Sequence, residues 1–128
     1  MGTRIAFVLL VTAWLLACSE TGGQVTPISP ETLLAAAPAN ALILDVRTPD
    51  EYGSSHVPGA VNVPHGEVAE RLAELGTNRD RPVIVYCESG RRAGLAEAVL
   101  VEAGFSDVRH LEGDMRAWRE AGRPTAKP

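Results

Sequence analysis

Apolar runs of strand length alternate with helix-like segments along most of this sequence, and this alternation constrains the fold more than any other feature. The runs at 41–46 and 82–86 are almost continuously apolar, and shorter strand candidates lie at 61–63 and 107–111. Continuously apolar strands are typical of sheets that are buried on both faces, and strand–helix alternation favours parallel pairing. The sequence therefore predicts an α/β fold with a central parallel sheet and helices on both faces.

Helix signals fall between these strands. Ser29 followed by Pro30 is typical of a helix start, with serine as the N-cap and proline in the first turn, and this helix is expected to end near Ala37. An amphipathic helix is predicted over 67–75, and Gly76 ends it. Further helical segments are expected at 48–52, 95–104 and 114–121.

Length and composition limit the classes of function. The chain has 128 residues, which suggests one domain, and 45% hydrophobic with 22% charged residues is ordinary for an α/β protein. The net charge of −4 argues against a nucleic acid partner. The three histidines, His56, His65 and His110, are spread out without the spacing of metal ligands, so neither a metal site nor a cofactor is expected.

The first 17 residues predict a bacterial lipoprotein signal peptide. A short positively charged start precedes an apolar stretch from Ile5 to Leu16, which is too short for a transmembrane span. The stretch ends in Leu-Leu-Ala-Cys, which looks like a lipobox with Cys18 as the lipidated residue. A signal peptide that is cut elsewhere and an uncleaved anchor are the alternatives. The lipobox predicts a lipid-anchored protein of the bacterial cell envelope, with a periplasmic domain that meets the membrane only through the lipid.

Composition also suggests the boundaries of the domain. Residues 21–27 are small, polar and rich in helix breakers, as in a flexible linker. We therefore expect a signal peptide at 1–17, a lipidated tether at 18–28, a folded domain at 29–124 and a tail at 125–128.

Cys87 is the strongest candidate for chemistry. It directly follows the buried strand at 82–86 and precedes a turn that contains Gly90, Arg91 and Arg92. In open α/β sheets the binding crevice lies at the carboxyl ends of the strands. A thiol at such a position, beside a helix N-terminus and two guanidinium groups, is favoured as a thiolate, and the same site can hold an anion.

Other residues bear on this site. Gly90 permits a backbone conformation that turns several N–H groups inward, where they would stabilise a thiolate or a persulfide anion. Glu88 opposes the arginines and places a negative charge where an anionic donor must pass. Asp45 and Arg47 follow the carboxyl end of the first strand and are expected at the same edge of the sheet. The alternative for Cys87 is a buried, inert cysteine.

Four segments in this order resemble motifs of the rhodanese family of sulfurtransferases. They are an Asp-x-Arg…Glu-Tyr segment at 45–52, a His-x-Pro-Gly-Ala-x-Asn-x-Pro turn at 56–64, a Cys-x-x-Gly-x-Arg loop at 87–92 and a closing Gly…Trp…Gly-x-Pro segment at 111–124. The resemblance covers essentially all of the predicted domain, and the combination of four segments is far more specific than any one of them.

The resemblance implies a single rhodanese domain with a five-stranded parallel sheet and with Cys87 as the sulfur acceptor. Thiosulfate or another persulfide donor would leave a sulfur atom on Cys87, and cyanide, a thiol or a protein acceptor would take it. Arg92 would close the loop, Arg47 would reach or brace the pocket, and Asp45 would be structural. The residues implied to bind the substrate are Glu88, Ser89, Gly90, Arg91, Arg92 and Arg47.

Other functions are possible on the same scaffold. One is a non-enzymatic persulfide carrier that binds a partner protein. Another is a phosphatase or arsenate reductase, although phosphatases that resemble rhodaneses use a loop one residue longer, so the shorter span favours sulfur. A Cys–His protease arrangement is conceivable, but no second element of the sequence supports it.

Overall fold

The computed structural model describes residue 2 and residues 24–128, so Cys18 and most of the predicted signal peptide and tether lie outside the described residues. The elements are β1 (Thr26–Ile28), α1 (Pro30–Ala36), β2 (Leu42–Asp45), α2 (Pro49–Ser54), β3 (Val61–Asn62), the 3-10 turns η1 (His65–Glu67) and η2 (Leu72–Leu75), β4 (Val83–Tyr86), α3 (Arg91–Glu102), β5 (Val108–Leu111) and α4 (Asp114–Glu120).

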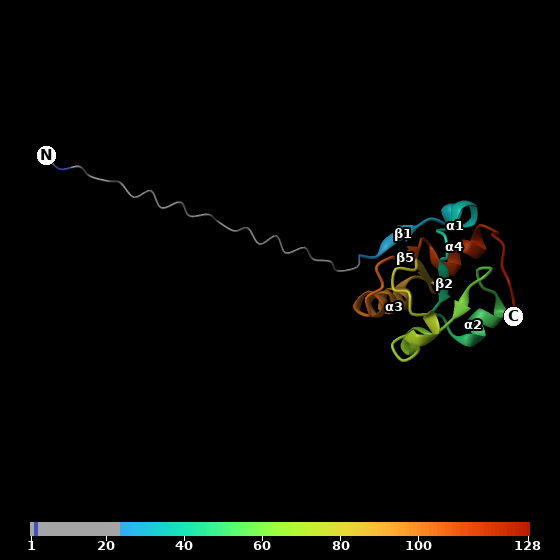
Figure 1. Ribbon diagram of the computed structural model, residues 1–128. Coiled ribbons are helices and arrows are strands. Elements are labelled where there is room, and N and C mark those ends of the chain that lie inside the picture. The colour runs from blue at the N-terminus through green and yellow to red at the C-terminus, as the bar shows by residue number, and fades with distance from the viewer. Residues whose placement is uncertain (1, 3–23) are drawn as a thin grey trace.

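A five-stranded sheet with the order β1-β5-β4-β2-β3 forms the centre of the molecule, and every strand pair is parallel. Figure 1 shows α3 on one side of the strands, with α1 and α4 on the other. The prediction of a parallel α/β sheet with helices on both faces is confirmed.

The two core layers follow from the alternation of side chains along each strand. In and just after β4, Val83, Val85 and Cys87 pack in the layer beneath α3, whereas Ile84 and Tyr86 pack in the layer that contains Trp118 of α4. All five are buried, because β4 is an interior strand covered on both faces. Cys87 therefore emerges from the middle of the sheet.

The predicted tether includes residues that are part of the sheet. Thr26–Ile28 form β1 and pair with β5 in parallel, with Ile28 opposite Leu111. Ile28 is only 3% exposed. The strand was not predicted because the residues around it are small and polar. Pro27 is compatible with β1 because β1 is an edge strand. The folded unit thus begins before residue 29.

The helix predicted over 67–75 is also different in the structure. It is replaced by η1 and η2, because Arg71 at φ −112° and ψ 20° departs from helical geometry between them. Val68 and Leu75 are nevertheless buried, so the apolar pattern correctly predicted the inward face although it did not predict the type of helix. Gly76, at φ +88°, ends η2.

Two further boundaries differ from the sequence prediction. Helix α3 begins at Arg91, four residues before the predicted start at Leu95, so the arginines of the Cys87 loop are its first turn. The predicted tail is attached to the domain, because Ala126 forms an antiparallel bridge with His56. Just before the tail, the Trp118 indole donates to the carbonyl of Pro124 at 2.7 Å. The C-terminus accordingly lies beside α2 (Figure 1). In the part of the chain that the structure describes, no helix is long and apolar enough to cross a bilayer.

Candidate active site around Cys87

The Cys87 loop connects the end of β4 to the start of α3. Gly90 is the residue before the helix and has φ +111°, a conformation that favours glycine. This turn directs the Gly90 N–H toward Cys87, where it donates to Sγ at 3.0 Å. Among residues 24–128, the amides of Ser89, Arg91 and Arg92 have no protein acceptor, as expected of the first N–H groups at a helix start. The loop therefore holds a free thiol with one main-chain donor on Sγ and with three further amides that have no protein acceptor.

The start of α4 holds the other side of the same loop. The carboxylate of Asp114 accepts the Cys87 N–H at 3.0 Å, and the N–H of Met115 donates to the Cys87 carbonyl at 3.0 Å. The N–H of Arg116 donates to the Glu88 carbonyl at 3.2 Å. The first turn of α4 thus holds the carbonyls of both Cys87 and Glu88. Sequence reasoning missed this contribution.

Arg92 connects α3 to α2. Its guanidinium forms a bidentate ion pair with Glu51, with nitrogen–oxygen distances of 2.6 and 3.0 Å. The Arg92 hydrogen bond, together with those from Thr48 in the α2 capping box, lowers the pKa of Glu51 to about 2. This pair attaches the first turn of α3 to α2, and the role of Arg92 in closing the loop stays a prediction. Arg91 is exposed beside it.

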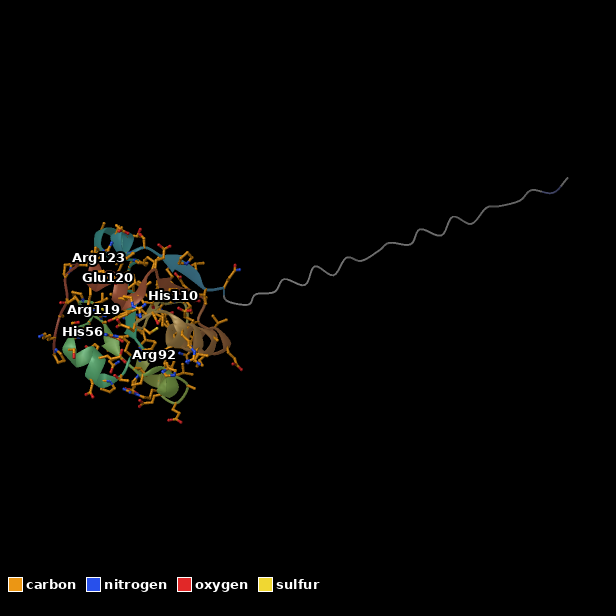
Figure 2. All side chains as sticks on the ribbon, turned by 180° about the vertical axis from the view of Figure 1, so that it is seen from behind. His56, Arg92, His110, Arg119, Glu120 and Arg123 are labelled. Carbon is orange, nitrogen blue, oxygen red and sulfur yellow. The ribbon has the colours of Figure 1, made fainter. Side chains whose placement is uncertain are left out.

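Glu88 is paired with different arginines from those the sequence suggested. Its carboxylate forms a bidentate pair with Arg119 of α4, which raises the pKa of that guanidinium, and it lies 3.6 Å from Nη1 of Arg47. Arg92 and Arg119 are both labelled in Figure 2, which shows the molecule from behind the view of Figure 1. The negative charge of Glu88 is thus balanced by Arg119 and Arg47, which weakens the expected repulsion of an anionic donor.

Arg47 braces the site from within. Its guanidinium donates to both oxygens of Asp45 at 2.7–3.1 Å and to the Ser55 carbonyl at 2.6 Å. Burial opposes its charge, yet the bonds to Asp45 raise the pKa of Arg47. The Tyr86 hydroxyl donates to Asp45 at 2.7 Å, and burial followed by this carboxylate raises its pKa. Arg47 is 2% exposed, so in this structure it braces the loop, and its Nη1 is the atom that approaches Glu88.

The turn at 56–64 closes this edge of the sheet. The His56 ring stacks on Tyr52 with centroids 3.7 Å apart, and its Nδ1 lies 2.9 Å from the Tyr52 carbonyl. Tyr52 thus holds the His56 ring through both its own ring and its carbonyl. The Asn62 amide donates to the carbonyls of Asp45 and Arg47, both at 3.0 Å, and fixes the chain that leaves β2.

Three charged residues beneath the loop escaped sequence reasoning. Glu97, His110 and Asp114 come from α3, β5 and α4, and they contact one another through His110. The only local signal was an acidic residue after Gly113, which gave no indication of a partner. Within residues 24–128, no group of three or more potential ligands is arranged to hold a metal ion.

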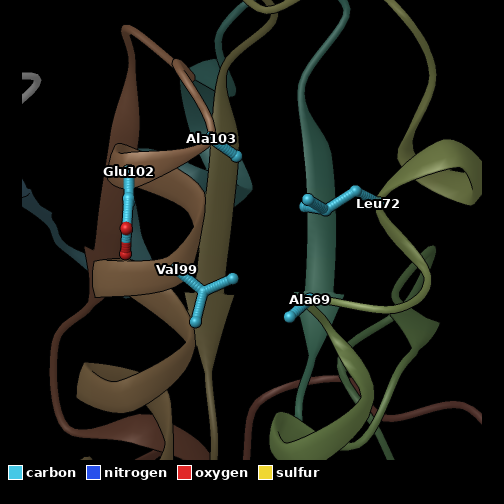
Figure 3. Close-up of a pocket in the computed structure, with 5 residues that line it drawn as sticks. All are labelled: Ala69, Leu72, Val99, Glu102 and Ala103. Atoms are coloured by element: carbon cyan, nitrogen blue, oxygen red, sulfur yellow. The ribbon is translucent and has the colours of Figure 1, made fainter.

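An apolar pocket lies elsewhere on the molecule. It has a volume of about 310 Å³ and is lined by Ala69, Leu72, Val99, Glu102 and Ala103 (Figure 3). Val99, Glu102 and Ala103 lie at the C-terminal end of α3, the end opposite to the Cys87 loop, and Ala69 and Leu72 come from the segment that leads into and starts η2. None of the predicted site residues lines it.

The sequence matches the family of rhodanese-like domains over residues 29–121. It is 41% identical over 70 residues to the thiosulfate sulfurtransferase PspE of Escherichia coli, covering 55% of this chain and 67% of PspE. It is 35% identical over 92 residues to the thiosulfate sulfurtransferase GlpE of Pseudomonas syringae, covering 72% of this chain and 85% of GlpE. Family membership therefore rests on most of the folded unit.

Two further comparisons extend this result. The putative sulfur carrier protein YrkF of Bacillus subtilis is 35% identical over 102 residues, which is 78% of this chain and only 54% of YrkF. Among solved structures, a rhodanese with anions from E. coli superposes with a TM-score of 0.59 and 35% identity, covering 69% of this chain and 99% of that one. Its fold agrees with the sheet described above.

Proposed function

Since the chain belongs to the family of rhodanese-like domains, we propose that it is a sulfurtransferase that carries a sulfane sulfur on Cys87. One observation carries this proposal: the Gly90 N–H donates to Sγ at 3.0 Å, in a loop where the amides of Ser89, Arg91 and Arg92 have no protein acceptor among the described residues. Main-chain N–H groups that can donate to a thiolate can also donate to the terminal sulfur of a persulfide anion, which lies one S–S bond further from the chain. The relatives named as sulfurtransferases support the same class of reaction.

The reaction consists of two displacements at sulfur. The Cys87 thiolate attacks the outer sulfur of a donor such as thiosulfate, a new S–S bond forms, and the donor's own S–S bond breaks so that sulfite leaves with the electron pair. A nucleophile such as cyanide or a thiolate then attacks the terminal sulfur, and the Cys87 thiolate is regenerated. Covalent transfer of this kind predicts ping-pong kinetics. No external oxidant or reductant is needed.

The size of the site supports sulfur over a larger group. Cys87 is 1% exposed, so the loop must relax before any donor reaches Sγ. A single sulfur atom requires less movement than a phosphoryl group with its oxygens. Arg91 is the exposed guanidinium of the loop and is the residue we assign to the approaching anion. Arg92 and Arg47 are instead engaged in ion pairs with Glu51 and Asp45, and they support the loop without contacting the donor.

A persulfide carrier is the second candidate. The burial of Cys87 would protect a bound sulfur, and one relative is named as a putative sulfur carrier. A carrier forms the Cys87 persulfide once and passes it to a partner protein, without repeated turnover with small acceptors.

The test follows thiocyanate production from thiosulfate and cyanide. We expect activity in the wild-type protein and none in C87S, because oxygen cannot accept the sulfane sulfur. The matched control is C18S, a change of the same type outside the domain, which is expected to retain activity. Activity that survives in C87S would refute the assignment. A persulfide mass shift of Cys87 without turnover would favour the carrier.

We also propose that Cys18 is lipidated and anchors the domain to the bacterial cell envelope, with the domain in the periplasm. The support is the Leu-Leu-Ala-Cys sequence after the apolar stretch. Intact mass would show the lipid, and C18S would move the protein from the membrane fraction to the soluble fraction. An unmodified Cys18 in protein isolated from membranes would contradict this proposal.

A further inference from the structure

A charged cluster lies directly beneath the Cys87 loop. His110 of β5 is placed between two carboxylates: its Nε2 donates to Asp114 at 3.0 Å, and its Nδ1 contacts Glu97 closely. Glu97 and Asp114 are buried, at 6% and 3% exposure. Buried carboxylates need a partner, and here one imidazole serves both. The cluster thus joins α3, β5 and α4.

Asp114 adopts a backbone conformation that is unfavourable for its type. It has φ +55°, directly after Gly113 at φ +79°, and left-handed geometry at a residue other than glycine is uncommon. Such strain persists where the surrounding contacts require it. At Asp114 these contacts are two hydrogen bonds: one carboxylate oxygen accepts the Cys87 N–H, and the other accepts from His110. The strained residue is therefore the connection between the cluster and the reactive cysteine.

Gly90 completes the connection on the other side of the sulfur. A Cβ at this position would lie 3.1 Å from Oδ2 of Asp114 and 3.7 Å from the His110 ring, so the cluster is packed against the residue whose N–H donates to Sγ. Movement of Asp114 or His110 would displace both the Cys87 amide and Gly90.

We propose that Glu97, His110 and Asp114 form a positioning triad that holds the Cys87 loop in its sulfur-accepting conformation and balances negative charge beneath the sulfur. The inference rests on the proposed function of Cys87 and adds three residues to it. The triad touches no substrate and acts through the Cys87 amide and Gly90.

Charge explains why a histidine stands between the two carboxylates. Without a cation, Glu97 and Asp114 would both oppose a thiolate or persulfide on Cys87. The hydrogen bonds to Asp114 and then to Glu97 raise the pKa of His110 to about 10, so the imidazole is a cation at neutral pH. The charged groups facing His110 are Glu97 from α3 and Asp114 from α4, while its neighbour across the sheet in β1 is Pro27. One of the two negative charges is thus cancelled.

The first experiment separates strain from positioning at Asp114. D114G relieves the left-handed backbone but removes the acceptor of the Cys87 N–H. D114N keeps an oxygen that can accept this N–H. We expect D114G to lose at least tenfold in kcat/KM for sulfur transfer, and D114N, which keeps an acceptor for the Cys87 N–H, to recover much of that loss; a melting curve checks that both variants are folded. Wild-type activity in D114G would overturn the proposal.

The second experiment reads the charge balance independently of sulfur transfer. The alkylation rate of Cys87 by iodoacetamide is followed against pH in H110Q and E97Q. H110Q leaves two uncompensated carboxylates, so its half-maximal rate should move to higher pH by about one unit. E97Q removes one carboxylate, so its profile should move to lower pH.

The opposite signs distinguish positioning from general damage to the fold. Shifts in the same direction, or no shift in either variant, would overturn the triad. If the wild-type protein transfers no sulfur, the proposed function fails, whereas the alkylation profiles still test the triad.

Discussion

At the level of single residues, the site depends on backbone geometry as much as on side-chain chemistry. Gly90 combines φ +111° with a position that would bring a Cβ to 3.1 Å from Asp114. Both features prevent any side chain there without movement of the loop. The reactivity of Cys87 is thus coupled to a residue that has no functional group of its own.

G90A is expected to lose about 1–3 kcal/mol of unfolding free energy, the usual size of local backbone strain, and at least tenfold in sulfur transfer. Chemical denaturation and the thiocyanate assay measure the two effects. The matched control is G53A, because Gly53 lies in α2 with open space around it and no positive φ. G53A should be neutral or stabilised by up to about 1 kcal/mol. A G90A protein as stable as G53A would contradict the argument.

Residues next to one another in sequence were predictable, and residues joined only by the fold were not. Cys87 and Arg92 share one turn, so the spacing of the two residues along the chain is enough to indicate a site. Asp114 reaches Cys87 across 27 positions, and His110 reaches Glu97 across 13. Their pairing depends on the order β5-β4 and on the left-handed start of α4, neither of which leaves a local signal.

At the level of elements, the Cys87 loop is held from two helices that are distant in sequence. Helix α4 binds its carbonyls, and α2 binds Arg92 through Glu51. The capping box of α2, with Thr48 and Glu51 bonded reciprocally, fixes Glu51 before it meets Arg92. Thr48 and Glu51 thus connect an ordinary helix start to the loop.

The pair between Glu51 and Arg92 makes stability depend on acidity. Because the pKa of Glu51 is held at about 2, below its ordinary 4.5, the pair contributes above pH 4.5 and its contribution is lost as the pH falls toward 2. Glu51 is partly exposed to solvent, which screens the pair, so the contribution is about 0.5–1 kcal/mol. E51Q should remove this part of the acid dependence in denaturation curves measured from pH 6 to 2. D50N, a neighbouring change of the same type, should retain it; identical curves for the two variants would exclude the pair as the cause.

The edge strand β1 tests how far the folded unit extends. Ile28 is 3% exposed against β5, whereas Val25, just before the strand, is 37% exposed. We expect I28A to lose about 2–4 kcal/mol of unfolding free energy and V25A less than about 0.5 kcal/mol. Urea denaturation gives both values. If I28A were as stable as V25A, β1 would not belong to the core.

At the level of the whole molecule, the parallel order brings the ends of separate segments to one edge of the sheet. Apolar runs and helix signals predicted this architecture, because burial on both faces leaves a clear pattern in the strands. They did not predict β1 or the 3-10 turns, since a three-residue edge strand buries little and Arg71 breaks a pattern that looks helical. The conformation of both segments is determined by contacts between residues that are distant in sequence.

His110 is the residue where this architecture is most open to a global test, because its contacts unite α3, β5 and α4. Its pKa is raised to about 10 in the folded protein against 6.5 ordinarily, so its stabilising effect is complete below pH 6.5 and is lost as the pH rises through 10. For a half-buried cation hydrogen-bonded to carboxylates we expect about 2 kcal/mol. Wild-type protein should therefore lose this amount between pH 6.5 and 10 in denaturation measurements, and H110Q should show a flat curve over the same range. A wild-type curve that is equally flat would mean that the histidine is neutral and that the two carboxylates are balanced by another group.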